Sequence, residues 1–201
     1  MSSETRVLLV RHGQSEWNET GRWQGQADPP LTDLGRTQAF EAARALGAVD
    51  AVWASDLQRA AATAMVLSES LGVGPVVLDL DLRERDAGEW SGLTRDEIEE
   101  RYPGYLGNGA RPPGWEPDER LLARALRVLA RIGEAVPGGD VVAVTHGGLI
   151  YTVEVHLGAE FARIANVEGR WVAVDAARGT LRLGDRLLLA EPGDVTVPRQ
   201  I

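Results

Sequence analysis

The chain has 201 residues, of which 44% are apolar, and this suits one α/β domain with a sizeable core, which we expect to span residues 1–201. Its formal net charge of −9 argues against nucleic acid or an anionic membrane as the general partner, because a broadly negative surface repels polyanions. The longest apolar runs are too short to span a bilayer and the N-terminus lacks the charged-then-apolar pattern of a signal peptide, so we expect a cytoplasmic protein, either monomer or homo-oligomer.

The first predicted strand covers residues 6–10, a short apolar run that leads directly into Arg11 and His12. A second β-branched run, 141–144, leads in the same way to His146. Each histidine is followed by glycine, which lets the backbone turn away from the sheet. Two of the three histidines share this context, so we expect the two strands to lie parallel and adjacent, with both imidazoles side by side at one edge of the sheet.

Apolar residues at helical spacing and helix-capping signals predict four helices between these strands, at residues 33–46, 55–72, 95–101 and 117–135. Ser55 is the expected N-cap of the second helix, which places Arg59 in or just after its first turn. The arginines of the fourth helix are expected to form a solvated face. Further elements are expected as strands at 50–54 and 76–80, a helix at 149–157 and a hairpin over 171–183.

Two stretches without a regular pattern, 14–31 and 103–117, are expected to be loops that border a site. The first is polar, and the second is dense in Pro, Gly and Trp. Strands and helices otherwise alternate, with no internal repeat and no linker that would mark a second domain. This order predicts a three-layer α/β/α sandwich with a mostly parallel central sheet.

Two histidines and two arginines at one sheet edge indicate phosphoryl transfer. All 21 basic residues are arginine, and Arg11 and Arg59 can each offer a planar pair of donors to the oxygens of a phosphoryl group. We expect His12 to be the nucleophile, because a covalent phosphohistidine splits one difficult displacement into two easier ones. For this role its Nδ1 must be bound to a nearby acceptor, so that Nε2 carries the attacking lone pair. His146 is expected to bind the transferring oxygens.

The leaving alkoxide needs a proton, and Glu84 is the best candidate to supply it. It directly follows a predicted strand, in a loop next to the sheet edge. In an extended backbone its side chain points away from those of Arg83 and Arg85. These two arginines therefore need not keep the carboxyl group ionised.

The same residues resemble the motifs of a known family, the histidine phosphatase superfamily, in its phosphoglycerate mutase-like branch. The matching stretches occur in the family's order and cover most of residues 7–150; they are LLVRHGQSEWN at 8–18, GRWQGQADPPLTDLGRTQA at 21–39, SDLQRAAATA at 55–64, LRERDAGEWSG at 82–92 and THGG at 145–148. One departure is visible before the last long helix, where members often carry Gly-Glu-Ser and this chain has PGWEPD at 113–118. Substrate contacts from that segment are therefore not transferred.

The resemblance implies a role for each matching position, with no metal and no other cofactor. Catalysis is assigned to His12, Glu84, His146, Arg11 and Arg59. Substrate contacts are assigned to Gly13, Asn18, Gln24 and Gly147. The carbonyl group of Gly13 would also orient the phosphorylated residue, His12. The implied partner is a small phosphorylated metabolite.

The segment between Glu84 and His146 helps to choose among activities of the family. Phosphoglycerate mutases carry a longer segment there than the 61 residues, 85–145, of this chain. A mutase must hold its intermediate and exclude water, which a short cover does less well. We therefore predict a phosphomonoester hydrolase, with a phosphoglycerate or a sugar-phosphoglycerate ester among the candidate substrates.

Three alternatives remain beside this prediction. Phosphoglycerate mutase-type phosphoryl transfer uses the same residues, and a catalytically silent regulator would only bind phosphorylated ligands. A metal hydrolase built on His12 and His146 is the third. The chain disfavours it, because it has no H-x-x-x-H pair and no cluster of Asp and His with ligand spacing.

Overall fold

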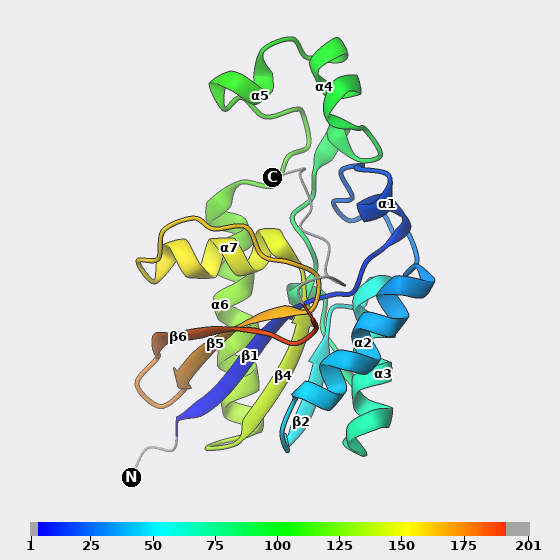
Figure 1. Ribbon diagram of the computed structural model, residues 1–201. Helices are drawn as coiled ribbons and strands as arrows, with labels where there is room; N and C mark the ends of the chain where they lie inside the picture. Colours follow the sequence, from blue (N-terminus) through cyan, green and yellow to red (C-terminus); the bar gives the residue numbers. More distant parts are fainter. Residues whose placement is uncertain (1–3, 192–201) are drawn as a thin grey trace.

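The computed structural model describes residues 4–191, so both ends of the predicted domain over 1–201 lie outside the described residues. A six-stranded sheet forms its centre, in the order β3-β2-β4-β1-β5-β6 (Figure 1). The strands are β1 (Thr5–Arg11), β2 (Ala51–Ala54), β3 (Val77–Leu78), β4 (Asp140–Thr145), β5 (Glu168–Asp175) and β6 (Thr180–Leu188). Strands β1 to β4 pair in parallel, whereas the hairpin β5-β6 joins antiparallel to β1. The prediction of a mostly parallel sheet is confirmed.

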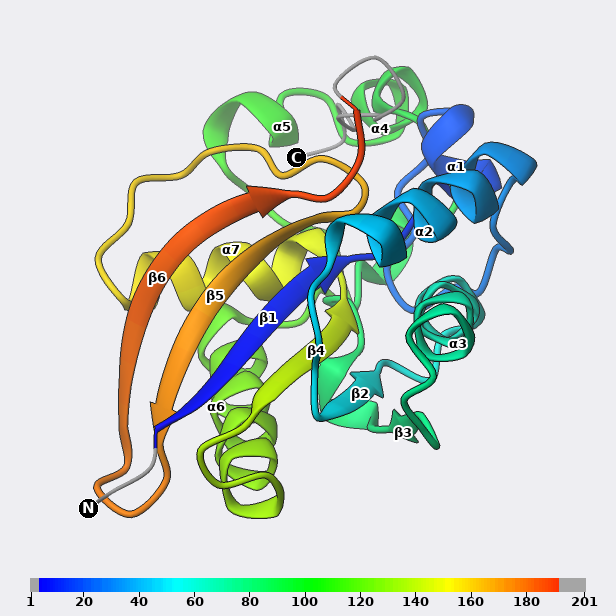
Figure 2. The same ribbon diagram turned by 60° about the horizontal axis from the view of Figure 1, so that its bottom comes forward.

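Helices cover both faces of the sheet. They are α2 (Asp33–Ala45), α3 (Gln58–Leu71), α6 (Asp118–Ala135) and α7 (Gly147–His156). Side chains alternate between the two faces of a strand, so Val7 and Leu9 of β1 join the core under α6 and α7, whereas Leu8 and Val10 join the core under α2 and α3. Figure 2 shows the two helix pairs on opposite sides of the sheet. The three-layer α/β/α sandwich is confirmed.

Shorter helices complete the described chain. They are α1 (Glu16–Glu19), α4 (Arg95–Arg101), α5 (Tyr105–Asn108) and two 3-10 turns, η1 (Leu80–Leu82) and η2 (Gly88–Trp90). Helices α4 and α5 project beyond the carboxyl edge of the sheet (Figure 1), and a separate apolar cluster that includes Trp23, Trp90 and Ile98 holds them there. Helices α1 and α5 lie within the two stretches predicted to be loops. Among residues 4–191, every helix is too short or too polar to cross a membrane.

The predicted length of one strand and the predicted N-cap of one helix are wrong. The strand expected at 76–80 contains only Val77 and Leu78, because it is an edge strand and pairs only with the last residues of the four-residue strand β2. Ser55 is not the N-cap of α3. Its Oγ accepts the N–H of Leu57 at 3.2 Å, and the helix begins one residue later. The other predicted helices are confirmed to within two residues at each end.

The arginines of α6 do not all face the solvent. Arg127 and Arg131 lie on the exposed side and pair with aspartates near η1, as a solvated face requires. Arg124 is only 7% exposed, so the prediction is wrong for this residue. It shares a side of the helix with the buried Leu121 and Val128, and the end of η1 and the chain after it, residues 81–84, supply carbonyl acceptors there.

Candidate active site

Two histidines meet at the carboxyl edge of the sheet. Strands β1 and β4 pair in register with Arg11 opposite Thr145, so the next residues, His12 and His146, leave the sheet side by side. The backbone N–H of His12 donates to the Thr145 carbonyl at 3.0 Å, and the two ring centroids are 5.1 Å apart. The predicted juxtaposition of the two imidazoles is confirmed.

The imidazole ring of His12 is oriented at both of its nitrogens. Nδ1 lies 2.6 Å from the carbonyl oxygen of Gly13, so this nitrogen carries the proton and donates it. Nε2 accepts the N–H of Arg59 Nε at 3.2 Å. Burial, then the charges of Arg59 and Arg11, hold the pKa of His12 well below its ordinary value. The ring is therefore neutral near pH 7, with its lone pair on Nε2, the form in which imidazole acts as a nucleophile.

Arg59 reaches His12 from the first turn of α3, and its side chain is fully buried. Two further donors of its guanidinium bind backbone carbonyls, that of Ala27 at 2.8 Å and that of Gly25 at 2.9 Å. Burial lowers the pKa of Arg59 to about 10, which still leaves it cationic near pH 7. A fixed cation therefore lies directly beside the histidine nitrogen that carries the lone pair.

Several buried polar atoms beside His12 have no hydrogen-bond partner. They are Arg11 Nε, Asn18 Nδ2 and both ring nitrogens of His146. Leaving such a group buried and unpaired costs about 1–3 kcal/mol, so several at one place indicate a site for a ligand rich in acceptor oxygens. Burial and the charge of Arg59 lower the pKa of His146 well below its ordinary value, so this ring is neutral near pH 7 too.

Glu84 lies in irregular chain between η1 and η2 and not directly after a strand as predicted. Its Oε2 accepts the N–H of Gly148 at 3.1 Å and its Oε1 accepts the N–H of Arg85 at 2.7 Å. The charged group of Arg83 pairs with Asp56, and that of Arg85 pairs with Asp118. The ion pairs of these two neighbouring guanidinium groups are therefore formed with carboxylates other than that of Glu84.

A cavity of about 760 Å³ opens above the histidine pair. Six of the predicted site residues line it, namely Arg11, His12, Asn18, Gln24, Arg59 and Glu84. The other three, Gly13, His146 and Gly147, are buried and do not line the cavity. Gly148 forms part of the wall in addition to them. One cavity thus brings together the residues predicted to be the nucleophile, His12, and the proton donor, Glu84, with four of the residues predicted to bind phosphate or substrate.

The outer wall of the cavity is aromatic and cationic. The guanidinium groups of Arg111 and Arg85 lie over the ring of Trp115, 5.0 and 5.4 Å from its centroid. Leu122 and Phe161 add apolar surface to the same cavity. The stretch 103–117 therefore borders the cavity as predicted, and this outer part offers space for the organic portion of a ligand.

Sequence reasoning missed residues that form hydrogen bonds with His12, Asn18 and Arg11, which are predicted site residues. Asn166 Nδ2 donates to the carbonyl oxygen of His12 at 2.8 Å and to Asn18 Oδ1 at 3.3 Å. The Tyr151 hydroxyl accepts the N–H of Ile164 at 2.7 Å, and the Ile164 carbonyl accepts Arg11 Nη1 at 2.8 Å. Asn166 and Ile164 lie in irregular chain before β5, where no periodic pattern marks them, so only their tertiary contacts identify them.

Within residues 4–191, no group of three or more His, Cys, Asp or Glu side chains is placed to hold a metal ion. The two histidines face each other and two arginines rather than a carboxylate pair. Cationic guanidinium groups at this position suit an anion.

The sequence profile of the histidine phosphatase superfamily (branch 1) matches residues 7–176. The chain is 33% identical over 166 residues to a metal-independent phosphoserine phosphatase of Arabidopsis thaliana, which covers 78% of this chain and 70% of that protein. It is 37% identical over 167 residues to a glucosyl-3-phosphoglycerate phosphatase of Mycobacterium tuberculosis, with 76% of this chain and 74% of that protein covered. A solved structure of a mycobacterial glucosyl-3-phosphoglycerate phosphatase with VO3 superposes with a TM-score of 0.80 at 31% identity, over 89% of this chain and 96% of that one.

Proposed function

Because the chain belongs to the histidine phosphatase superfamily, we propose that it hydrolyses a small phosphomonoester through a phosphohistidine at Nε2 of His12. The observation that carries this proposal is the tautomer and the neutral charge of the His12 ring. Its Nδ1 proton is bound to the Gly13 carbonyl, and its neutral Nε2 lies beside Arg59 at the floor of the cavity. Substrate phosphate bound by Arg11, Arg59 and His146 would bring its phosphorus atom to this lone pair.

In the first step, the lone pair of His12 Nε2 forms a bond to phosphorus and the bond from phosphorus to the ester oxygen breaks. The electrons of that bond pass to the leaving oxygen, which takes a proton from the carboxylic acid form of Glu84. The negative oxygens of the transferring group lie against Arg11, Arg59 and His146, and buried nitrogens of Arg11 and His146 have no other hydrogen-bond partner. The Gly13 carbonyl stabilises the proton on Nδ1 while positive charge develops on the ring.

In the second step, water attacks the phosphorus atom and the carboxylate of Glu84 takes its proton. The bond between phosphorus and Nε2 breaks, the electron pair returns to His12, and inorganic phosphate leaves. The cavity lies above the histidines with Glu84 in its wall, so water and leaving group share one side of the phosphate. This order uses one carboxyl group as acid and then as base.

The size of the cavity bears on the substrate. Its 760 Å³ extends from His12 to Trp115 and Phe161, well beyond the space of one phosphate group. Together with the similarity to a glucosyl-3-phosphoglycerate phosphatase, this supports a metabolite whose organic part is large, such as a sugar-phosphoglycerate ester. A cytoplasmic location stays a prediction, and mutase-type phosphoryl transfer stays an alternative.

The direct test is to trap the intermediate. Brief incubation with a ³²P-labelled phosphomonoester, followed by denaturation, should leave label that is stable to base and labile to acid, on a peptide containing His12. His12→Ala should remove both label and turnover, whereas His156→Ala, the exposed third histidine, should remain labelled.

A panel of phosphorylated metabolites, assayed for released phosphate and for isomerised product, separates the alternatives. Free phosphate is expected from at least one sugar-phosphoglycerate ester. Isomerised product in excess of phosphate would establish a mutase. Tight binding without either product would establish a silent regulator.

A further inference from the structure

The segment that carries Glu84 has no regular secondary structure to hold it. Residues 83–87 lie between the two 3-10 turns η1 and η2, and the sheet ends before them. Proton transfer requires hydrogen-bond distance to the leaving oxygen, and an error of about 1 Å in such a group can cost about a hundredfold in rate. Something outside the segment must therefore fix its backbone.

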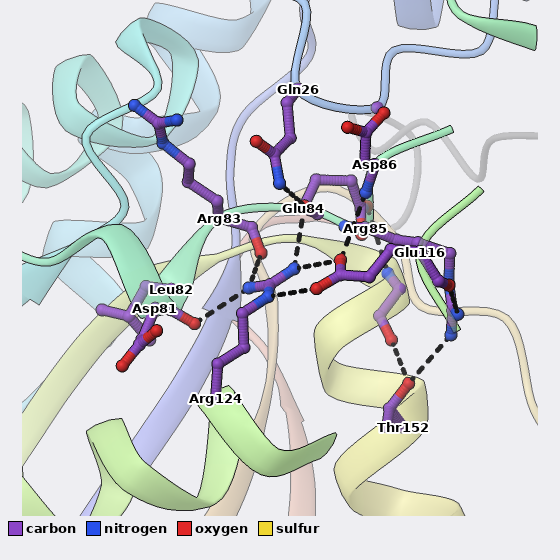
Figure 3. A network of polar contacts seen from close by, with 12 residues as sticks. Gln26, Asp81, Leu82, Arg83, Glu84, Arg85, Asp86, Glu116, Arg124 and Thr152 are labelled. Atoms are coloured by element: carbon purple, nitrogen blue, oxygen red, sulfur yellow. Dashed lines mark hydrogen bonds and ion pairs between the residues drawn. The ribbon is translucent and has the colours of Figure 1, made fainter. Parts of the chain in front are cut away.

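Figure 3 shows one guanidinium group, that of Arg124 on α6, against the backbone of this segment. Nη1 donates to the carbonyl oxygens of Asp81, at 2.9 Å, and of Arg83, and Nη2 donates to the carbonyl oxygen of Glu84 at 2.9 Å. A single rigid plane of donors thus binds three carbonyls within four residues. The geometry suits arginine, because lysine lacks such a plane.

The same guanidinium is held by Glu116, just before α6. Nε and Nη2 of Arg124 donate to its two carboxylate oxygens, each at 2.8 Å. Both side chains are more than nine-tenths buried. Burial alone would raise the pKa of Glu116, but the hydrogen bonds and charge of Arg124 lower it overall, so the pair is ionic. Ordering an ion pair in the interior is costly, and a buried pair is not by itself a gain in stability.

Glu116 also binds the backbone just after Glu84 in the chain. Its Oε2 accepts the backbone N–H of Asp86 at 3.2 Å, and its own N–H donates to the Asp86 carbonyl at 3.0 Å. Arg124 therefore binds the chain up to Glu84 and Glu116 binds it two residues later. The two members of this ion pair therefore bind the backbone on both sides of Glu84, as Figure 3 shows.

Neither member of the pair is among the residues that line the cavity. We propose that the buried pair Glu116–Arg124 positions Glu84 for proton transfer, by binding the backbone on both sides of it, and does not bind phosphate. This inference rests on the proposed function, in which Glu84 protonates the leaving oxygen. Arg124 is thus a positioning residue that acts through Glu84.

Substrates that differ in their need for a proton test the inference. An alkyl phosphate releases a basic alkoxide that needs the acid, whereas 4-nitrophenyl phosphate releases a weakly basic phenolate that does not. The rate of phosphoenzyme formation should be measured before the steady state, because Glu84 also serves the second step. Arg124→Lys keeps the charge and removes the plane of donors. It should slow phosphorylation from the alkyl phosphate about tenfold to a hundredfold, and from 4-nitrophenyl phosphate less than about threefold.

A double-mutant cycle makes the test specific. If Arg124 acts only through Glu84, then Arg124→Lys should have no further effect on phosphorylation from the alkyl phosphate in a Glu84→Gln background. The dissociation constant of inorganic phosphate should stay within about twofold of the wild-type value in both single variants. Arg127→Lys, on the exposed side of the same helix and paired with Asp81, is the matched control and should behave as wild type.

The outcomes separate the two hypotheses. If Glu84→Gln discriminates between the substrates and Arg124→Lys slows both equally, or weakens phosphate binding, the inference is overturned and the proposed function stands. If Glu84→Gln itself fails to discriminate, the assignment of the acid is wrong. Should Arg124→Lys not fold, as judged by circular dichroism, Glu116→Gln gives the same comparison with the charge of Arg124 kept, and equal slowing of both substrates would again overturn the inference.

Discussion

Arg59 uses one side chain for three tasks at the floor of the cavity. Its Nε donates to His12 Nε2, while its two terminal nitrogens bind the carbonyls of Ala27 and Gly25. The backbone bonds fix the plane of the guanidinium, so the group need not be ordered when substrate arrives. Burial lowers its pKa to about 10 without removing its charge near pH 7. The fixed orientation of the Arg59 guanidinium group therefore matters as well as its charge.

We expect Arg59→Lys to slow phosphoenzyme formation by about tenfold to a hundredfold, although the charge is kept. Lysine cannot make the planar set of bonds, and loss of one charge-assisted hydrogen bond is worth about 1.5–3 kcal/mol. Rapid-quench measurement with a labelled phosphomonoester checks this. Arg44→Lys, an exposed arginine in the last turn of α2, is the control. Wild-type rates for Arg59→Lys would remove the residue from the phosphate site.

At the scale of elements, the turn after β1 is set by its contact with the start of α2. A side chain on Gly13 would place Cβ 2.4 Å from the Gly35 carbonyl oxygen, and one on Gly35 would place Cβ 2.1 Å from the Gln14 carbonyl oxygen. The two backbones are thus in direct contact. This contact supports the carbonyl group of Gly13, which accepts the hydrogen bond from His12 Nδ1.

We expect Gly35→Ala to lower the free energy of unfolding by about 1–3 kcal/mol, because the added methyl group collides with backbone that has no easy movement. In a helix alanine is favoured over glycine by about 1 kcal/mol, so the collision must outweigh that gain. Gly47→Ala, just beyond the same helix with nothing within 4 Å of its Cβ, should be neutral. Urea unfolding of both variants measures the difference, and equal stabilities would contradict the predicted close contact.

For the whole molecule, the two neutral histidines make stability depend on pH. The pKa of both His12 and His146 is lowered in the folded protein, mainly by burial and the charges of nearby arginines. Below about pH 6.5 the unfolded chain therefore binds protons at these positions that the folded protein does not. The contribution of these two histidines to the free energy of unfolding is fully present above about pH 6.5, and it decreases as the pH falls below that value.

We expect the free energy of unfolding to decrease below pH 6.5, with each of these histidines contributing a slope of up to about 1.4 kcal/mol per pH unit. Urea unfolding between pH 5.5 and 7.5 should show a smaller slope for His146→Gln than for the wild type. His156→Gln, at an exposed position, is the comparison and should keep the wild-type slope. The same slope in all three proteins would mean that His146 is not held neutral by the fold.

The sequence by itself determined the layers of the fold and the centre of the site. Strand and helix periodicities are local, so the three-layer sandwich and most helix boundaries followed from them. Arg11, His12 and Gly13 are neighbours in the chain, and the same strand-His-Gly pattern at His146 implied a parallel partner strand. These inferences needed no knowledge of which distant segments meet.

Only the tertiary structure decided what holds these groups in place. Periodicity put Arg124 on a helix but could not show that irregular chain near residue 84 would cover it, because burial depends on packing partners far away in the sequence. The same reason hid Asn166, whose amide reaches the backbone of His12 across 154 positions. The length of β3 also depended on its neighbour, since a strand ends where pairing ends. Local signals thus specify the chemistry, and long-range contacts specify its geometry.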